Sequence, residues 1–129
     1  MNYNFLMNAE CLEGSLRYKW AKFGRTSASQ SSNAIDELGR MFTWGQNNDG
    51  ESGQGDPSID SLRFIELATQ VGAKSDWVKA CSGEMSTIAI NKSGELWGWG
   101  TSENNGETFG LPPNSGDDGG NVFYYPRRV

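Results

Sequence analysis

The side chains that could do chemistry in this chain are mainly carboxylates in glycine-rich stretches, and the chain contains no histidine to assist them. Asp49, Glu51 and Asp56 follow one aromatic segment, and the pair Asp117 and Asp118 lies in a later loop. These oxygens could serve as calcium ligands, but the order of residues does not match an EF-hand loop. We therefore interpret the aspartate pair as a solvated turn, and we predict no metal site and no cofactor.

The sequence also argues against an enzyme that uses a serine or cysteine nucleophile. Without histidine, a serine or cysteine nucleophile loses its usual general base. Cys81 ends the alternating segment Trp77–Cys81, which predicts a packed thiol rather than a reactive one. Cys11 lies in an unlike context, and the two cysteines do not form a metal-ligand spacing. We predict two free thiols and a protein that is not an enzyme.

Aromatic and amide side chains are the better candidates for contacting a ligand or a partner. Strand alternation would place Trp97 and Trp99 on one face of a strand, as it would Phe42 and Trp44 earlier in the chain. Core packing between sheets is the first interpretation of that face, and an aromatic platform for a sugar or a base is the alternative. The candidate contact residues are Trp97, Trp99, Asn104, Asn105, Asn47 and Asn48.

These residues recur because the chain contains an internal repeat. Phe42–Asp56 and Trp97–Gly110 both run from an aromatic segment into a turn of glycine and asparagine, and most matching positions are offset by 55 residues. Ahead of each aromatic segment, a short turn closes on glycine, which is typical of a type I turn followed by a left-handed residue. The repeat signature is Ala34, Ile35, Gly39, Trp44, Gly45 and Gly50 in the first copy, and Ala89, Ile90, Gly94, Trp99, Gly100 and Gly106 in the second.

A repeat of about fifty residues with glycine-aromatic signatures is typical of β-propeller blades. We therefore predict an all-β fold with about two blades, each of four short antiparallel strands. Residues 20–76 form the first propeller-type repeat, residues 77–129 form the second, and residues 1–19 form an N-terminal arm or docking segment. Helices should be few, and only Phe64–Val71 could hold a helical turn.

The signature resembles the repeat of the regulator of chromosome condensation family. An Ala-Ile strand, a turn ending in glycine, a strand ending in Trp44-Gly45 and a Gly-x-Gly-Asp ending at Asp56 carry the resemblance. It spans Trp20–Val129 and is looser in the second copy. The family usually has a histidine three residues before the Ala-Ile pair, where this chain has Ser31 and Ser86. The resemblance implies a propeller of about seven blades that recognises proteins through loops at one end.

Length and charge limit the partners. The 129 residues suit one domain, the formal net charge is −5, and no run of lysine or arginine could follow a phosphate backbone. Direct nucleic-acid binding is therefore not expected. The N-terminus lacks the pattern of a signal peptide, and no apolar stretch approaches the ~20 residues of a membrane helix. We predict a soluble protein without a membrane partner, whose partners are proteins.

Two blades do not close a propeller, which needs roughly four to eight. We predict completion by a homo-oligomer, with a trimer favoured, or by a larger assembly. A non-enzymatic structural or interaction module of this size would suit a virion surface, as a phage decoration or fibre-like protein. A carbohydrate- or receptor-binding module is the alternative, and a guanine-nucleotide exchange regulator is a further one.

Overall fold

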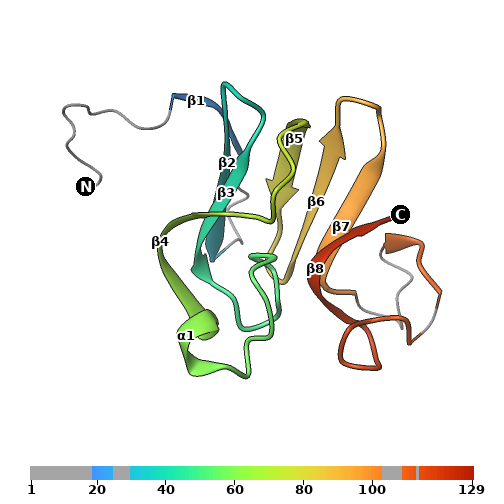
Figure 1. Ribbon diagram of the computed structural model, residues 1–129. Helices are drawn as coiled ribbons and strands as arrows, with labels where there is room; N and C mark the ends of the chain where they lie inside the picture. Colours follow the sequence, from blue (N-terminus) through green and yellow to red (C-terminus); the bar gives the residue numbers. More distant parts are fainter. Residues whose placement is uncertain (1–18, 25–29, 103–108, 113) are drawn as a thin grey trace.

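The computed structural model describes residues 19–24, 30–102, 109–112 and 114–129, and it contains two four-stranded antiparallel sheets that lie side by side (Figure 1). Each sheet runs in chain order from its first strand to its fourth, as a propeller blade does. Blade 1 consists of β1 (Trp20–Gly24), β2 (Ser31–Asp36), β3 (Met41–Gln46) and β4 (Phe64–Gln70). Blade 2 consists of β5 (Trp77–Ser82), β6 (Ser86–Asn91), β7 (Leu96–Thr101) and β8 (Val122–Arg128). The predicted all-β fold of two propeller-type blades is confirmed.

The second and third strands of each blade are joined by the expected turn. In blade 1 the Gly39 amide donates to the Asp36 carbonyl over 3.1 Å, and Gly39 has a φ of 82°. In blade 2 the Gly94 amide donates to the Asn91 carbonyl over 2.9 Å, with a φ of 79° at Gly94. The Asp36 carboxylate and the Asn91 amide oxygen accept further backbone amides inside their turns. The left-handed glycine predicted for both turns is therefore confirmed.

Steric contacts explain why a glycine follows the tryptophan in both copies of the repeat. The ladder between third and fourth strands shifts register next to Gly45 in blade 1 and next to Gly100 in blade 2. Both glycines have positive φ, 102° and 96°. A Cβ at Gly45 would lie 2.8 Å from the Gln30 carbonyl oxygen, and one at Gly100 would lie 2.4 Å from the Met85 carbonyl oxygen. Only glycine fits a backbone conformation and a backbone contact of this kind.

The prediction of a helical turn at Phe64–Val71 is wrong. The helix α1 covers Asp60–Arg63 and ends where β4 begins. Ile65 of β4 pairs with Gly45 of β3, and pairing to a neighbouring strand overrides the weak helical pattern of this segment. No helix among the described residues is long and apolar enough to cross a membrane.

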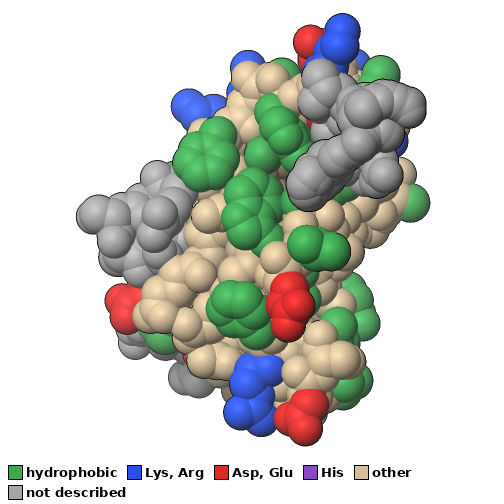
Figure 2. Space-filling model, turned by 90° about the vertical axis from the view of Figure 1, so that its left-hand side faces the viewer, with side chains coloured by type: hydrophobic (Ala, Val, Ile, Leu, Met, Phe, Trp, Pro, Cys, Tyr) green, Lys and Arg blue, Asp and Glu red, His purple; other side chains and the backbone are tan. Residues whose placement is uncertain are grey.

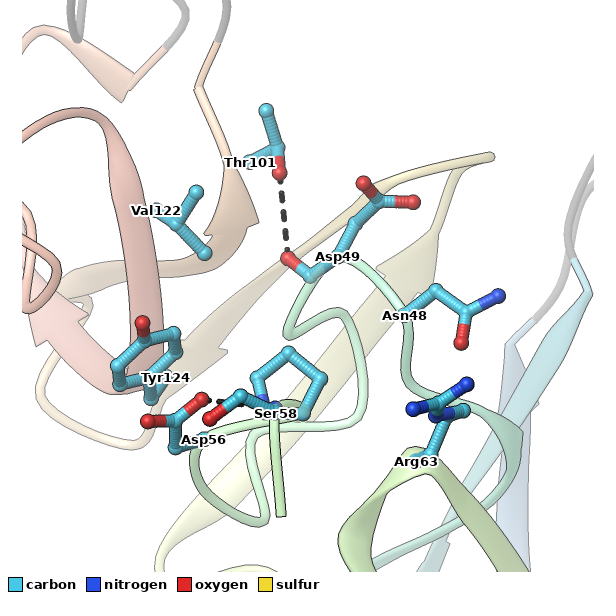
Figure 3. Close-up of a pocket in the computed structure, with 9 residues that line it drawn as sticks. Asn48, Asp49, Asp56, Ser58, Arg63, Thr101, Val122 and Tyr124 are labelled. Carbon is cyan, nitrogen blue, oxygen red and sulfur yellow. Dashed lines mark hydrogen bonds between the residues drawn. The ribbon is translucent and has the colours of Figure 1, made fainter. Parts of the chain in front are cut away.

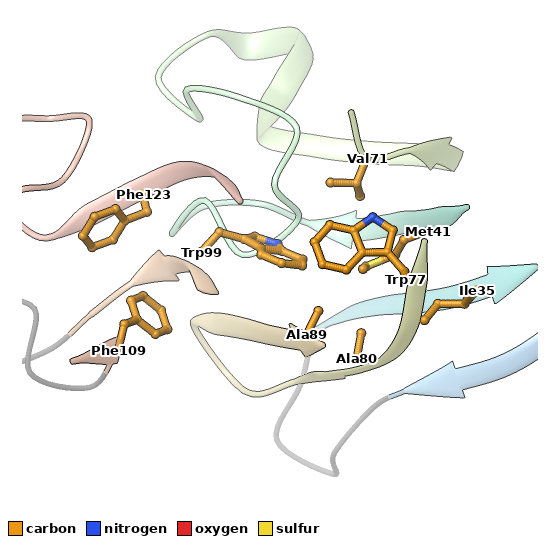
Figure 4. Close-up of a cluster of buried hydrophobic side chains, with 9 residues drawn as sticks. All are labelled: Ile35, Met41, Val71, Trp77, Ala80, Ala89, Trp99, Phe109 and Phe123. Atoms are coloured by element: carbon orange, nitrogen blue, oxygen red, sulfur yellow. The ribbon is translucent and has the colours of Figure 1, made fainter. Parts of the chain in front are cut away.

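Most of the hydrophobic core lies between the two blades (Figure 4), whereas Phe109 packs over Gly98 on the other face of blade 2. Trp99 is fully buried and Trp77 packs beside it, with ring centroids 6.0 Å apart. Blade 1 contributes only non-aromatic side chains to this core, whereas the second half of the chain contributes all of its aromatic ones together with two alanines. The buried cluster consists of Ile35, Met41 and Val71 from blade 1, with Trp77, Ala80, Ala89, Trp99, Phe109 and Phe123 from the second half of the chain. Folding and blade pairing therefore depend on the same side chains.

Candidate functional site

The loop that follows β3 joins the two blades. Residues 47–55, here called the inter-blade loop, leave blade 1 and lie against β6, β7 and β8 of blade 2 (Figure 1). The Thr87 hydroxyl donates to the Glu51 carbonyl over 2.9 Å, and the Gly55 amide donates to the Tyr124 carbonyl over 3.2 Å. The glycine-rich stretch of the repeat thus forms a contact between blades.

Asn47 organises the inter-blade loop from inside. Its side chain is fully buried, and its amide oxygen accepts the Ser52 amide over 2.9 Å. Its amide nitrogen donates to the carbonyls of Gly55 and Leu62, over 3.3 and 2.8 Å. Since these bonds use both ends of the amide, the structure places Asn47 within the loop, whereas Asn48 is exposed beside it.

The glycines of the loop allow close approach to blade 2. Gly53 has a φ of 71°, and a Cβ there would lie 2.8 Å from the Trp99 ring nitrogen. Gly50 has a φ of 78° and lies over Phe123 and Gly100 of the next blade. The glycine spacing of the motif therefore permits the loop to cover the buried tryptophan.

A pocket of about 350 Å³ opens beside the inter-blade loop, between the blades (Figure 3). Pro57, Val122 and Tyr124 give it an apolar wall, and Asp49 and Asp56 bring carboxylates to it. The remaining lining residues are polar or cationic: Asn48, Ser58, Arg63 and Thr101. The Arg63 guanidinium forms an ion pair with the exposed Asp60 carboxylate at 3.3 Å.

Among the described lining residues, the carboxylates of Asp49 and Asp56 outnumber the single cation, Arg63. Burial raises the pKa of the Asp49 carboxyl, a hydrogen bond from Thr101 opposes this, and the Glu84 charge adds to the rise. The pKa of the Tyr124 hydroxyl is also raised, first by burial and then by the charges of nearby aspartates. Those aspartates are Asp56, Asp118 and Asp117. A cation at the pocket would relieve this repulsion.

Glu51 lies in the inter-blade loop, at the contact between the blades. It is 1% exposed, and one carboxylate oxygen accepts the Asp49 amide over 3.0 Å. The other oxygen is buried without a hydrogen-bond partner among the described residues. Burial is the main cause that raises the pKa of Glu51 to about 7. From the sequence, Glu51 could be identified only as a loop carboxylate, because the neighbouring residues do not indicate that this loop is buried.

The described members of the predicted contact set, Trp97, Trp99, Asn47 and Asn48, differ in exposure and do not share one surface. Trp99 is fully buried between the blades, and Trp97 is half-buried, with the Lys74 amine 4.8 Å from its ring centroid. Asn104 and Asn105 lie outside the described residues, as do Gly106 of the signature, Cys11 and most of the predicted arm. Of the four candidates that the structure describes, only Asn48 lines the pocket.

Two further expectations concern reactive groups. Within the described ranges, no group of three or more histidine, cysteine, aspartate or glutamate side chains could hold a metal ion. Cys81 is a free thiol as predicted, but the expectation that it is packed is wrong, because it is exposed. β5 turns Trp77 and Ala80 toward blade 1, and Cys81 therefore points away from it.

Comparison with known proteins places the chain among repeat proteins much longer than itself. No family model matches it. The human and mouse E3 ubiquitin-protein ligase HERC2 are each 31% identical over 91 residues, which is 70% of this chain and 2% of the relative. The mitochondrial RCC1 domain-containing protein RUG3 of Arabidopsis thaliana is 35% identical over 72 residues, or 54% of this chain and 15% of the relative.

Solved structures of the same architecture are similar over nearly the whole chain. Human WBSCR16 superposes with a TM-score of 0.65 at 18% identity, covering 89% of this chain and 26% of that one. Yeast RCC1 (Prp20), solved in complex with Kap60, gives 0.67 at 16% identity, covering 90% of this chain and 26% of that one. A second structure of Prp20 from Saccharomyces cerevisiae, described with its binding to Gsp1p and histones, gives 0.68 at 13% identity with the same coverage. At these identities the structures support the fold.

Proposed function

The chain belongs to the RCC1-like repeat family, and from this we propose that it works as a non-enzymatic protein-interaction module. Its contact surface is the pocket beside the inter-blade loop, and the partner supplies a basic segment. The observation that carries the proposal is the combination of two carboxylates and an apolar wall in one pocket.

A lysine or arginine side chain matches that combination. Each carries a charged head on an aliphatic stem, so the head would lie near Asp49 and Asp56 while the stem packs on Val122 and Tyr124. The aromatic ring adds a surface that attracts cations. An acidic partner would meet the carboxylates that raise the pKa of Tyr124, and it would be repelled.

Relatives of this fold support protein recognition in general terms. Prp20 has been described with Kap60, Gsp1p and histones, all of which are protein partners of that chain. Nucleotide exchange on a small GTPase stays a prediction for the present chain. A nucleotide-release assay with a purified GTPase would test it.

The test of the proposed function is binding of a fluorescent lysine-rich peptide, followed by anisotropy against a glutamate-rich peptide of the same length. Asp49→Asn and Asp56→Asn should each weaken binding about two- to fivefold, since each removes one partly exposed charge contact. Glu66→Gln is the matched control, because Glu66 is an exposed carboxylate on β4 that does not line the pocket. Equal binding by all three variants, or equal binding of both peptides, would refute the proposal.

Three finer predictions, about the location, the ligand and the assembly of the protein, remain proposals that rest on the sequence. They are a virion-surface decoration or fibre-like role, a glycan or receptor site, and a homo-oligomer or larger assembly. Trp99 is fully buried, so its ring could not contact a glycan while the two blades stay packed together. Binding on a glycan array would support that alternative, and an inert array would remove it.

A further inference from the structure

The apolar side chains that blade 1 buries against blade 2 have equivalents in blade 2. These equivalents lie on the outer face of blade 2, which points away from blade 1. The backbone positions are equivalent: the Val71 amide donates to the Met41 carbonyl over 2.8 Å, and the Val129 amide donates to the Leu96 carbonyl over 2.9 Å. The blade 1 side chains are 0% to 3% exposed, whereas their blade 2 equivalents are 40% to 44% exposed. The equivalent pairs are Ile35 and Ile90, Met41 and Leu96, and Val71 and Val129.

Blade 1 shows the complementary pattern on its own outer face. Trp77 of blade 2 is 2% exposed because blade 1 covers it, and its equivalent Trp20 is 46% exposed. Trp20 packs on Phe42 and Trp44, with ring centroids 5.1 and 6.4 Å away, much as Trp77 packs on its own neighbours. Figure 2 shows hydrophobic side chains gathered over the middle of this face.

We propose that two copies of this chain join head to tail through these faces. The head face is the outer face of blade 1, with Trp20, Phe23 and Trp44, and the tail face is the outer face of blade 2, with Ile88, Ile90, Leu96 and Val129. The proposal rests on the proposed protein-interaction role and names a partner for it, a second copy. The contact between blade 1 and blade 2 is the template, because it already joins an aliphatic face to an aromatic one.

Two differences make the contact between copies more apolar than the one inside the chain. At the internal contact the Asn33 amide donates to the Ser82 hydroxyl over 2.7 Å, and Ile88 holds the position equivalent to Asn33. Phe23, which is 66% exposed, holds the position equivalent to Ala80. A second copy would therefore cover large apolar side chains without leaving an amide unsatisfied.

The test uses one charged variant for each face. Phe23→Asp blocks the head face, Ile90→Asp blocks the tail face, and Leu38→Asp, in the exposed turn between β2 and β3, is the control. Sedimentation velocity should show a wild-type mass that rises with concentration, the same rise for the control, and monomers for each blocked variant. Circular dichroism identifies a variant that fails to fold, and Ile88→Asp then replaces Ile90→Asp.

Mixing the two blocked variants gives the decisive result. Each keeps one intact face, so an equimolar mixture should form a dimer of one copy of each, with twice the monomer mass. A two-fold symmetric contact would not be restored by mixing, because both partners would need the same face. A wild type that stays monomeric throughout, or a mixture that stays monomeric, would overturn the proposal.

Cys81 provides a second readout on the tail face, since it pairs with Ile88 in the sheet and is exposed. In a Phe23→Asp copy with Cys11→Ser, reaction of Cys81 with a maleimide should slow severalfold when a cysteine-free Ile90→Asp copy is added in excess. An unchanged rate would contradict head-to-tail docking. Lysine-peptide binding by the same variants should be unchanged, so failure of self-association is distinguishable from failure of the proposed function.

Discussion

Replacement of Glu51 by glutamine should stabilise the protein at neutral and alkaline pH. Glu51 is buried, one of its oxygens accepts the Asp49 amide, and the other has no hydrogen-bond partner among the described residues. The ionised carboxylate is therefore poorly solvated, and burial shifts its pKa upward. Glutamine keeps the size and the accepting oxygen of the side chain, but it carries no charge.

The size of the effect follows from the pKa. Burial raises the pKa of Glu51 from 4.5 to about 7, so the folded state holds its proton more tightly than the unfolded state does. The free energy of unfolding should therefore fall as pH rises from 4.5 to about 7, and it should level off above that. At about 1.4 kcal/mol per pKa unit, the full cost of ionisation is about 3 kcal/mol.

The assay is urea denaturation of the wild type and Glu51→Gln from pH 4 to pH 8. At pH 8 the variant should be more stable by up to about 3 kcal/mol, and the difference should vanish toward pH 4. Asp49 faces the same region and its pKa also moves upward, so the comparison uses the difference between the two proteins rather than either curve alone. Glu66→Gln, on the exposed side of β4, serves as the control with little change.

A pH-independent difference would refute this reasoning. It would mean that glutamine changes packing or hydrogen bonding rather than removing a buried charge. A variant less stable than the wild type at pH 8 would refute it more strongly, because the ionised Glu51 would then be stabilised by its surroundings.

Two further predictions concern the repeat residues, and both use urea denaturation with a matched control. Gly100→Ala should cost about 3 kcal/mol or more, because its Cβ would meet the Met85 carbonyl, whereas Gly94→Ala, with similar φ and open space around it, should cost about 1 kcal/mol. Equal losses would show that backbone conformation alone matters. Asn47→Ala should cost about 2–4 kcal/mol by leaving buried loop groups unsatisfied, whereas Asn48→Ala should cost little. A small loss at Asn47 would contradict its structural role.

The sequence was sufficient for the fold because the glycines that shape each blade have local causes. Gly39 and Gly94 have the left-handed conformation that closes a hairpin, and Gly45 and Gly100 permit a close backbone contact at a register shift. Local causes of this kind repeat with the chain. An internal offset therefore predicted two blades and their strand order without any knowledge of the packing between them.

The candidate functional site could not be predicted from the sequence, because it depends on contacts between residues that are far apart in the chain. Asn47 and Asn48 are neighbours of the same type, but only one is enclosed by the loop, since its enclosure depends on Leu62 and on blade 2. In the sequence, Glu51 cannot be told apart from an exposed loop carboxylate. In the structure it is buried, because the loop packs against β6. The strand at Phe64–Gln70 was missed for the same reason, because β3 supplies the partner that decides its conformation.

The two faces of a blade differ in their side chains, so consecutive blades can stack in only one orientation. An aliphatic face, an aromatic face and a loop that reaches only toward the following blade cannot be satisfied by turning one copy over onto another. Each blade must therefore meet its neighbour in the same sense as blade 1 meets blade 2. A charge at Met41 or Trp77 would disrupt folding, whereas one at the equivalent Leu96 or Trp20 would disrupt only the contact with a further blade. The same positions of the repeat thus specify the fold in one blade and, under the proposed head-to-tail contact, the partner in the next.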